Sequence, residues 1–420
     1  MQIGKPQLES IVQALTVILP ARQPADATLH HFFREHKNLG SRDRALIADT
    51  VYAALRRRRY LEHVTPGATP REIALAALVK VQGVGIGQIE SALTPTEKAW
   101  LVTLKSEPAE ALPFEVQADL PDWVIALLRK QYSDEEILAL ARSLQQPAPL
   151  DLRVNSLKAP REAVLEKFDR DNIVAVPTKL APWGVRLREK PALNKYVLFT
   201  EGVVEVQDEG SQLLGLLMEP RRGEMIVDFC AGAGGKTLQM GAAMASQGRL
   251  YAFDISEKRL TNLGPRLKRS GLSNVHPQRI ANENDAKVKR LRGKIDRVLV
   301  DAPCTGLGTL RRNPDLKMRQ VETAVAELNV KQRNILDAAA ALVKPGGRLV
   351  YGTCSLLEAE NEAIVTAFLA SHPDFKLVPA KDVFARIGIE VEGTGDYMHL
   401  LPHRHDTDGF FAAVLQREGK

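Results

Sequence analysis

Residues 225–237 read MIVDFCAGAGGKT, an apolar strand that runs into a glycine-rich turn and then into a helix. Glycine lets a backbone adopt positive φ and approach a ligand closely. The next predicted strand, Arg249 to Phe253, is followed by Asp254, whose carboxylate can accept hydrogen bonds from both hydroxyls of a ribose. The turn, which consists of Cys230, Ala231, Gly232, Ala233, Gly234, Gly235 and Lys236, therefore predicts a nucleotide-type site, in which Cys230 is either structural or lines the ligand.

Several kinds of site compete for this turn. A dinucleotide site requires G-x-G-x-x-G, whereas Gly235 directly follows Gly234 here. A P-loop requires a glycine where Cys230 stands, although Lys236 and Thr237 fit its end. A site for S-adenosylmethionine requires the glycines and the ribose acid without a triphosphate cradle, so it fits best. A tight turn that binds nothing stays open as an alternative.

Strands and helices alternate after this turn. A helix is predicted over 257–270, an apolar strand over 297–300 and a long helix over 321–343. The residues KPGG at 344–347 are expected to break the chain before a strand over 348–351. Such alternation is typical of a mainly parallel, doubly wound sheet, which binds its ligands at the carboxyl ends of the strands.

The chain before this region divides into two further parts. Residues 1–145 are predicted to form a helical domain, because apolar residues recur there at helical spacing and Ser41 can cap one helix. Residues 146–220 are predicted to form a small mixed α+β segment, with short strands at 150–154, 184–187 and 203–206 and a helix at 211–218. The domain with the alternating pattern is then 221–420.

Composition limits the function classes. The 420 residues include 57 Lys and Arg against 51 Asp and Glu, a net charge of +6 that permits a polyanionic partner. The run Arg56 to Arg59 ends a predicted helix, where cations are stabilising, and could equally contact phosphates. Three cysteines, with no zinc-type spacing, argue against a disulfide framework and a metal site. Met1 to Glu9 lacks an apolar signal core and no run spans a bilayer, so a cytoplasmic location is predicted.

Two cysteines follow neighbouring predicted strands. Cys304 lies in the sequence DAPCTG that begins at Asp301, and Cys354 lies in GTCS. A single cysteine after a strand is more often a small buried apolar residue than a nucleophile. Since adjacent parallel strands bring their carboxyl ends together, both cysteines are expected to border the crevice that holds the glycine turn.

A thiol in such a crevice suits methylation at carbon 5 of cytosine. This carbon is a poor nucleophile until a thiolate adds to carbon 6, and a base must afterwards remove the carbon 5 proton. Asp301 would stabilise the adduct by sharing a proton with the ring, and Lys236 would help electrostatically. The structural alternatives are a turn-capping role for Asp301 and a solvated helix start for Lys236.

Taken together, these motifs resemble the Sun/RsmB-type RNA cytosine-C5 methyltransferases. The resemblance covers about residues 150–418 and also includes LRVN at 152–155, RRNPD at 311–315 and DGFF at 408–411. It implies a Rossmann-like class I methyltransferase domain that uses S-adenosylmethionine. The N-terminal third is similar, more weakly, to the NusB-like RNA-binding domain of the ribosomal members.

The resemblance also implies roles for individual residues. Cys354 would be the nucleophile and Cys304 would assist product release. The turn from Cys230 to Lys236, with Asp254 and Asp301, falls on the family's cofactor-contacting positions. A further cofactor acid usually follows the third strand in a Gly-Asp pair that is missing here; Asn282 is its match by position and Asp285 the fallback.

The main hypothesis is therefore a monomeric enzyme that methylates cytosine in RNA, most simply ribosomal RNA. A DNA cytosine methyltransferase is the first alternative, in which Cys304 would attack. A catalytically inactive RNA-binding ribosome-assembly factor is the second. The Thr-Cys motif at Cys354 argues against the first, and the intact set of Asp301, Cys304 and Cys354 argues against the second.

Overall fold

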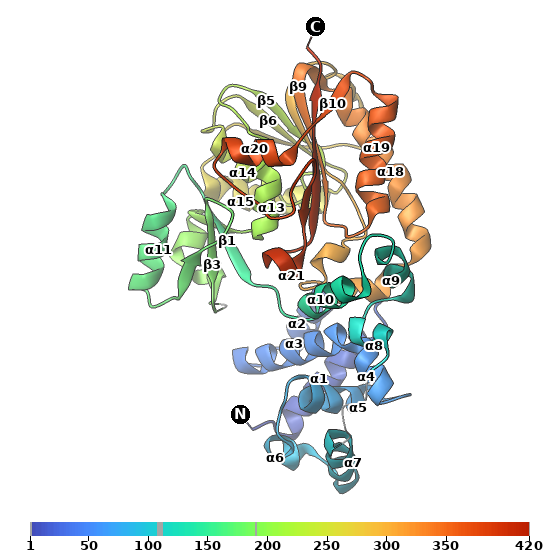
Figure 1. The fold of residues 1–420 in the computed structure, drawn as a ribbon. Coiled ribbons are helices and arrows are strands. Elements are labelled where there is room, and N and C mark those ends of the chain that lie inside the picture. The colour runs from blue at the N-terminus through green and yellow to red at the C-terminus, as the bar shows by residue number, and fades with distance from the viewer. Residues whose placement is uncertain (1, 107–111, 190, 420) are drawn as a thin grey trace. The chain divides into compact units, whose positions relative to one another are not determined.

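The computed structural model describes residues 2–106, 112–189 and 191–419, which form two compact units (Figure 1). We call the first the helical unit; it comprises Met1–Pro147 together with Thr309–Glu322. We call the second the sheet unit; it comprises Ala148–Gly308 and Thr323–Lys420. A short segment from the C-terminal half of the chain thus folds with the N-terminal helices.

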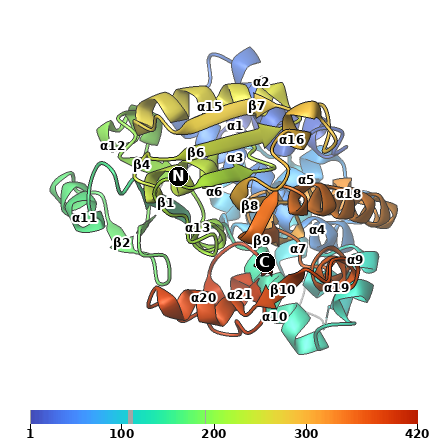
Figure 2. The ribbon, with the colours of Figure 1, turned by 90° about the horizontal axis from the view of Figure 1, so that it is seen from above.

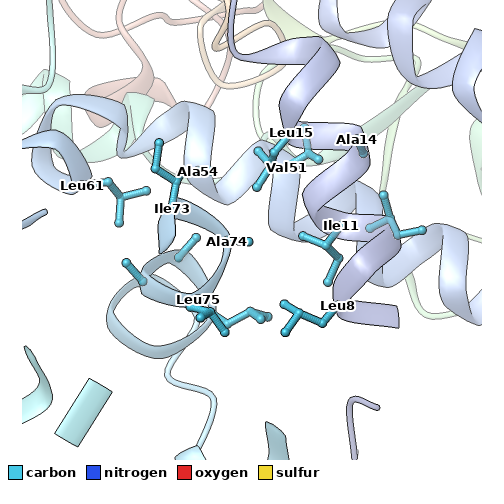
Figure 3. Close-up of a cluster of buried hydrophobic side chains, with 14 of the residues drawn as sticks. Leu8, Ile11, Ala14, Leu15, Val51, Ala54, Leu61, Ile73, Ala74 and Leu75 are labelled. Atoms are coloured by element: carbon cyan, nitrogen blue, oxygen red, sulfur yellow. The ribbon is translucent and has the colours of Figure 1, made fainter. Parts of the chain in front are cut away.

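Short helices build the helical unit, and those within residues 5–106 share one apolar core. Its elements are α1 (Lys5–Ile18), α2 (Ala25–Glu35), α3 (Ser41–Arg56), α4 (Arg58–Val64), α5 (Pro70–Ala76), the π-helix η1 (Ala77–Val81), α6 (Ile86–Ile89), the 3₁₀ turn η2 (Glu90–Ala92), α7 (Pro95–Ser106), α8 (Phe114–Ala118), α9 (Asp122–Leu128), α10 (Asp134–Leu144) and α17 (Leu316–Arg319). Leu8 of α1, Val51 of α3 and Ile73 of α5 meet in the core (Figure 3). Met318 of α17 packs against the same core.

The helical N-terminal region confirms the predicted class, but one capping expectation is wrong. Helix α3 begins at Ser41 itself, and Gly40 is the residue that precedes it. Glycine has no side chain with which to cap, so Asp43 reaches back and accepts a hydrogen bond from the Gly40 amide at 3.4 Å. The carboxylate also suits the positive end of the helix dipole.

The sheet unit begins with a small antiparallel sheet of order β2-β3-β1-β4. Its elements are β1 (Leu150–Val154), α11 (Arg161–Arg170), β2 (Ala175–Pro177), β3 (Gly184–Leu187), the 3₁₀ turn η3 (Leu193–Lys195), α12 (Val197–Thr200) and β4 (Val204–Val206). Leu152 of β1 and Phe168 of α11 are fully buried in its own core. The expected small α+β segment is therefore present, with α11 as a helix that the sequence pattern did not reveal.

The large sheet has the order β10-β12-β9-β8-β5-β6-β7, with β11 paired to β12. The strands β5 to β9 run parallel, and β10, β11 and β12 pair antiparallel. Its elements are α13 (Glu209–Leu216), β5 (Met225–Asp228), α14 (Gly235–Ala243), β6 (Arg249–Asp254), α15 (Glu257–Ser270), β7 (Val275–Arg279), α16 (Ala286–Lys289), β8 (Ile295–Asp301), the 3₁₀ turn η4 (Leu307–Thr309), α18 (Glu322–Ala340), β9 (Val343–Thr353), the 3₁₀ turn η5 (Glu358–Glu360), α19 (Glu362–Ser371), β10 (Phe375–Val378), α20 (Ala380–Arg386), β11 (Met398–Leu400), α21 (Pro402–His405) and β12 (Phe410–Arg417). This mostly parallel arrangement confirms the predicted Rossmann-like fold.

Helices cover both faces of this sheet. Successive residues of a strand point to opposite faces, so Ile226 joins a core with α13, α14, α15 and α20, whereas Val227 joins a core with α16, α18 and α19. In Figure 1, α13, α14, α15 and α20 lie to the left of the strands and α18 and α19 to the right, and Figure 2 likewise shows α13 and α20 on the opposite side from α18 and α19. Within the described residues, no helix combines the length and the apolar character needed to cross a bilayer.

The sequence predicted that the residues KPGG at 344–347 break the chain before a new strand, and this prediction is wrong. They lie inside β9, where the pairing with β8 jumps from Ile295↔Val343 to Arg297↔Arg348. The extra residues form a bulge, and Gly346 takes a φ of 73° there. Proline and two glycines therefore mark a local irregularity of one strand, because β8 pairs with β9 on both sides of it.

Candidate active site

The glycine turn joins β5 to α14 and depends on left-handed backbone at two glycines. Gly232 has a φ of 57° and Gly234 a φ of 84°. A Cβ on Gly234 would lie 2.2 Å from Leu263, so no larger residue fits that position without a shift. At Gly232 and Gly235, by contrast, no atom lies within 4 Å of the Cβ position. The turn is thus packed from below at Gly234 and open at the other two glycines.

Asp254 stands at the end of β6, directly beside the turn. The side chain is buried, and its Oδ2 accepts a hydrogen bond from the Gly232 amide at 2.9 Å. Its Oδ1 accepts one from the Ser256 amide at 2.7 Å. The predicted ribose-binding acid therefore also holds the turn in place, and each carboxylate oxygen keeps acceptor capacity for a ligand.

Two arginines support the turn, and the sequence pattern predicted neither role. Arg153 of β1 is buried and donates to the Gly235 carbonyl oxygen at 2.7 Å. Burial lowers the pKa of Arg153 to about 10. Arg266 of α15 donates to the Ala233 carbonyl oxygen at 2.7 Å. Only the motif LRVN at 152–155 gave a signal for Arg153, and none was available for Arg266.

Lys236 and Asp301 form an ion pair, with 2.7 Å between Nζ and Oδ2. The Lys236 side chain is only 10% exposed, so it is not a solvated helix start. Burial alone would lower the pKa of Lys236, but the charge of Asp301 and the hydrogen bond to it outweigh burial and raise that pKa. Nζ also lies 5.5 Å from the ring centre of Phe410. The pair places a fixed cation and a carboxylate at the end of β8.

The thiols of Cys304 and Cys354 meet at the carboxyl ends of the adjacent parallel strands β8 and β9. Their sulfurs are 3.4 Å apart, and both side chains are half-buried. The hydrogen bond with Cys354, followed by burial, raises the pKa of Cys304 well above its usual range. Cys230 is a third free thiol in the glycine turn, and burial raises its pKa as well. The structure thus brings the sulfurs of the two motif cysteines side by side at adjacent strand ends.

The two residues considered for a further cofactor contact make only local bonds among those observed. Asn282 is exposed, and its Oδ1 accepts from the Asn284 amide at 2.8 Å. Asp285 precedes α16 and accepts from the amides of Ala281 and Lys287, each at 2.8 Å. Asp285 thus acts as a helix cap in this structure. No group of three or more His, Cys, Asp or Glu side chains in the described part of the chain could hold a metal ion.

All four arginines of the run 56–59 have partners within the helical unit. Arg56 donates to the Arg311 carbonyl oxygen at 3.1 Å, and Arg57 stacks over Tyr60 at 4.6 Å. Arg58 pairs with Glu62, and Arg59 donates to the Leu120 carbonyl oxygen at 2.7 Å. These contacts account for the run as a structural feature between α3 and α4.

Comparison with known proteins gives consistent matches along the chain. The family described as 16S rRNA methyltransferase RsmB/F matches residues 215–416, and an RsmF/B-like ferredoxin-like domain matches 120–194. A probable ribosomal RNA small subunit methyltransferase B from Synechocystis is 37% identical over 73% of this chain and 69% of that protein. The ribosomal RNA small subunit methyltransferase B of Yersinia pseudotuberculosis is 35% identical over 70% of this chain and 66% of that protein.

Solved structures show the same architecture. The crystal structure of PH0851 has a TM-score of 0.80 and 27% identity, and the match covers 99% of this chain and 100% of that one. A methyltransferase homolog protein from Pyrococcus horikoshii has a TM-score of 0.57 and 28% identity, over 71% of this chain and 99% of that one. The similarity therefore includes the helical region as well as the sheet unit.

Proposed function

Because the chain belongs to the RsmB/F family of 16S rRNA methyltransferases, we propose that it methylates carbon 5 of a cytosine in small-subunit ribosomal RNA. The observation that carries this proposal is the pair of sulfurs 3.4 Å apart, Cys304 and Cys354, at adjacent strand ends. Asp301 of the Lys236–Asp301 ion pair is the last residue of β8, the strand that the Cys304 loop follows. A nucleophile, a second thiol and a charged pair are the groups that this chemistry needs.

The residues of the glycine turn fit S-adenosylmethionine, which supplies the methyl group when bound. The open space at Gly232 and Gly235 leaves room for a ligand to lie against the backbone. Asp254 holds the turn through the Gly232 amide, and in this proposal its carboxylate also accepts hydrogen bonds from the ribose hydroxyls. One protein of the same fold, NSun6 from Pyrococcus horikoshii, was solved with SFG; it has a TM-score of 0.63 and 21% identity.

In the proposed reaction, the Cys354 thiolate adds to carbon 6 of the cytosine ring. The ring electrons move toward carbon 5, which would then take the methyl group from the sulfonium sulfur of the bound donor, so that the methyl–sulfur bond breaks and its electron pair stays on that sulfur. Asp301 stabilises the adduct by sharing with ring nitrogen 3 a proton that the paired Lys236 ammonium supplies and takes back when the adduct breaks down. Removal of the carbon 5 proton returns the electrons to the ring, the carbon–sulfur bond breaks, and Cys354 leaves as a thiolate.

The close approach of the thiols favours a division of labour between them. Two thiolates 3.4 Å apart would repel each other, so the pair carries one negative charge at most. While Cys354 is the charged nucleophile, Cys304 stays protonated, in agreement with its raised pKa. Once Cys354 is bonded to carbon its charge is gone, so the half-buried Cys304 can release its proton to water and, as a thiolate, accept the carbon 5 proton.

Separate substitution of the two cysteines tests this assignment. With RNA that contains 5-fluorocytosine, wild-type protein should form a covalent adduct that survives denaturation. Cys354→Ser should form no adduct and transfer no methyl group, whereas Cys304→Ser should accumulate adduct on ordinary RNA because release is blocked. An adduct that persists in Cys354→Ser and disappears in Cys304→Ser would favour the DNA-type mechanism instead.

Two further measurements address the remaining alternatives. Absence of S-adenosylmethionine binding in calorimetry would favour an inactive RNA-binding assembly factor. Bisulfite sequencing of cellular RNA with and without the gene would identify the methylated cytosine. The monomeric state and the cytoplasmic location remain predictions, which sedimentation and fractionation can check.

A further inference from the structure

One buried carboxylate lies where the two cysteine loops meet. Glu360 ends the 3₁₀ turn η5 that follows β9, and its side chain is fully buried. Its Oε1 accepts from the Thr305 amide at 2.9 Å and from Gln332 Nε2 at 3.0 Å. Its Oε2 accepts from the Thr305 hydroxyl at 2.6 Å and from the Ser355 hydroxyl. Four donors from three separate segments therefore converge on this one group.

These donors are the immediate neighbours of the thiols. Thr305 follows Cys304 and Ser355 follows Cys354, so the carboxylate holds the residue after each cysteine. The two hydroxyls also lie 3.2 Å from each other. Gln332 of α18 adds a third connection, because it donates to the Pro303 carbonyl oxygen at 3.0 Å as well as to Glu360.

Burial of a carboxylate costs free energy, so a gain in fold stability does not by itself explain why Glu360 is buried here. Such a group is tolerated only when hydrogen bonds replace its hydration. Charge-assisted hydrogen bonds are short and directional, so four of them fix the geometry more tightly than apolar packing would. What they fix here is the separation of two loops whose thiols must act on the same ring.

We propose that Glu360 is a positioning residue, whose carboxylate holds the Cys304 and Cys354 loops at the separation that allows both thiols to serve one cytosine. This inference rests on the proposed function and adds a residue that contacts neither substrate nor cofactor in it. Glu360 acts through Thr305 and Ser355. Its negative charge also contributes to the raised pKa of Cys304, after the larger effects of Cys354 and burial.

The variant Glu360→Gln keeps the size of the side chain but replaces one acceptor oxygen by a donor nitrogen. On the Oε2 side that nitrogen would face the Thr305 and Ser355 hydroxyls, which would have to turn from donors into acceptors, and the charge that strengthens all four hydrogen bonds would be lost. Misplacement of reacting groups by about 1 Å can cost about 100-fold in rate, and we expect kcat to fall about 10- to 100-fold. The dissociation constant for S-adenosylmethionine should stay at the wild-type value, because the glycine turn is not part of this network.

The matched control is Glu358→Gln, in the same turn but with an exposed side chain. It should behave as wild type in every assay. Thr305→Val provides a second, milder variant, since it removes one hydroxyl donor and keeps the side-chain shape. We expect a smaller fall in kcat than for Glu360→Gln, and this variant decides the question if Glu360→Gln does not fold.

A probe whose binding does not depend on methyl transfer can report directly whether the two thiols lie close together. Phenylarsine oxide binds tightly where two thiols can bridge one arsenic atom, as Cys304 and Cys354 should; Cys304→Ser gives the background. Glu360→Gln should weaken this binding, and Glu358→Gln should not. Wild-type kcat and wild-type arsenical affinity in Glu360→Gln, or in Thr305→Val if the first variant is unfolded, would overturn the inference. If wild-type protein transferred no methyl group, the proposed function would fail, and the arsenical affinities would still decide the role of Glu360.

Discussion

Substitution of Gly308 by alanine should disturb the thiol site through the backbone of Cys354, which Gly308 contacts. Gly308 lies in η4, where its amide donates to the Cys354 carbonyl oxygen at 2.8 Å and its own carbonyl oxygen accepts from the Gly409 amide at 2.8 Å. A Cβ at this position would stand 2.2 Å from the Gly409 oxygen and 2.8 Å from the Cys354 oxygen. Both atoms belong to backbone, which cannot turn aside as a side chain can.

The expected magnitude follows from these contacts. The Gly409 oxygen must retreat by about 1 Å to reach an ordinary contact distance. Overpacking of this kind costs about 1–3 kcal/mol, and weakening of the two backbone hydrogen bonds adds about 1 kcal/mol each. We therefore expect Gly308→Ala to lower the free energy of unfolding by about 3–5 kcal/mol. Because Cys354 moves with its carbonyl group, kcat should also fall about 10- to 100-fold.

Urea unfolding and single-turnover methyl transfer measure the two effects. Gly87→Ala is the control, because Gly87 is exposed in α6, nothing lies within 4 Å of its Cβ position, and alanine favours a helix over glycine. That variant should be at least as stable as wild type and fully active. If Gly308→Ala matched it in both assays, the close approach of the Gly308 and Gly409 backbones would have no energetic weight, and the reasoning would be wrong.

Two other substitutions test buried charges. Lys317 donates to the carbonyl oxygens of Arg56 at 2.8 Å and Asp119 at 2.9 Å, and it pairs with the Asp119 carboxylate. Lys317→Met should therefore lower the stability of the helical unit by about 3–5 kcal/mol, measured by calorimetry. An unchanged melting profile would show that the ion pair is dispensable. Burial raises the pKa of Asp228 to about 7, so the native state keeps a proton that the unfolded chain releases above roughly pH 4. Stability should fall as pH rises from about 4 to 7, and Asp228→Asn, which still accepts from Thr237, should remove this component. Equal pH slopes of the two proteins in urea titrations between pH 4 and 7 would contradict that assignment.

The strand ends of the site were predictable because they follow short apolar runs. Met225 to Asp228 and Arg297 to Val300 contain the continuous apolar character of strands buried on both faces, and each is followed at once by polar or glycine-rich sequence. Because parallel strands bring their carboxyl ends to one edge of the sheet, the sequence alone predicts that Asp301, Cys304 and Cys354 lie together there.

The supporting groups could not be predicted in the same way. Glu360 stands in the polar stretch 358–362, which is typical of an exposed helix start, and its donors Thr305 and Gln332 lie 55 and 28 residues away along the chain. Arg153 similarly lies in a short strand far from the turn it supports. Burial of such charges is decided by long-range packing, which periodicity does not encode.

The segment Thr309–Glu322 gives the molecule an unusual modularity. It is encoded within the methyltransferase region, yet Met318 and Lys317 complete the interior of the N-terminal helices. A gene fragment that stopped at codon 147 would encode the helical unit without one of its helices. Recombination that replaced the N-terminal region with that of a distant relative would leave the segment packed against a hydrophobic core of different sequence. The two parts of the gene are therefore expected to diverge together, and functional chimaeras should require both stretches to be exchanged.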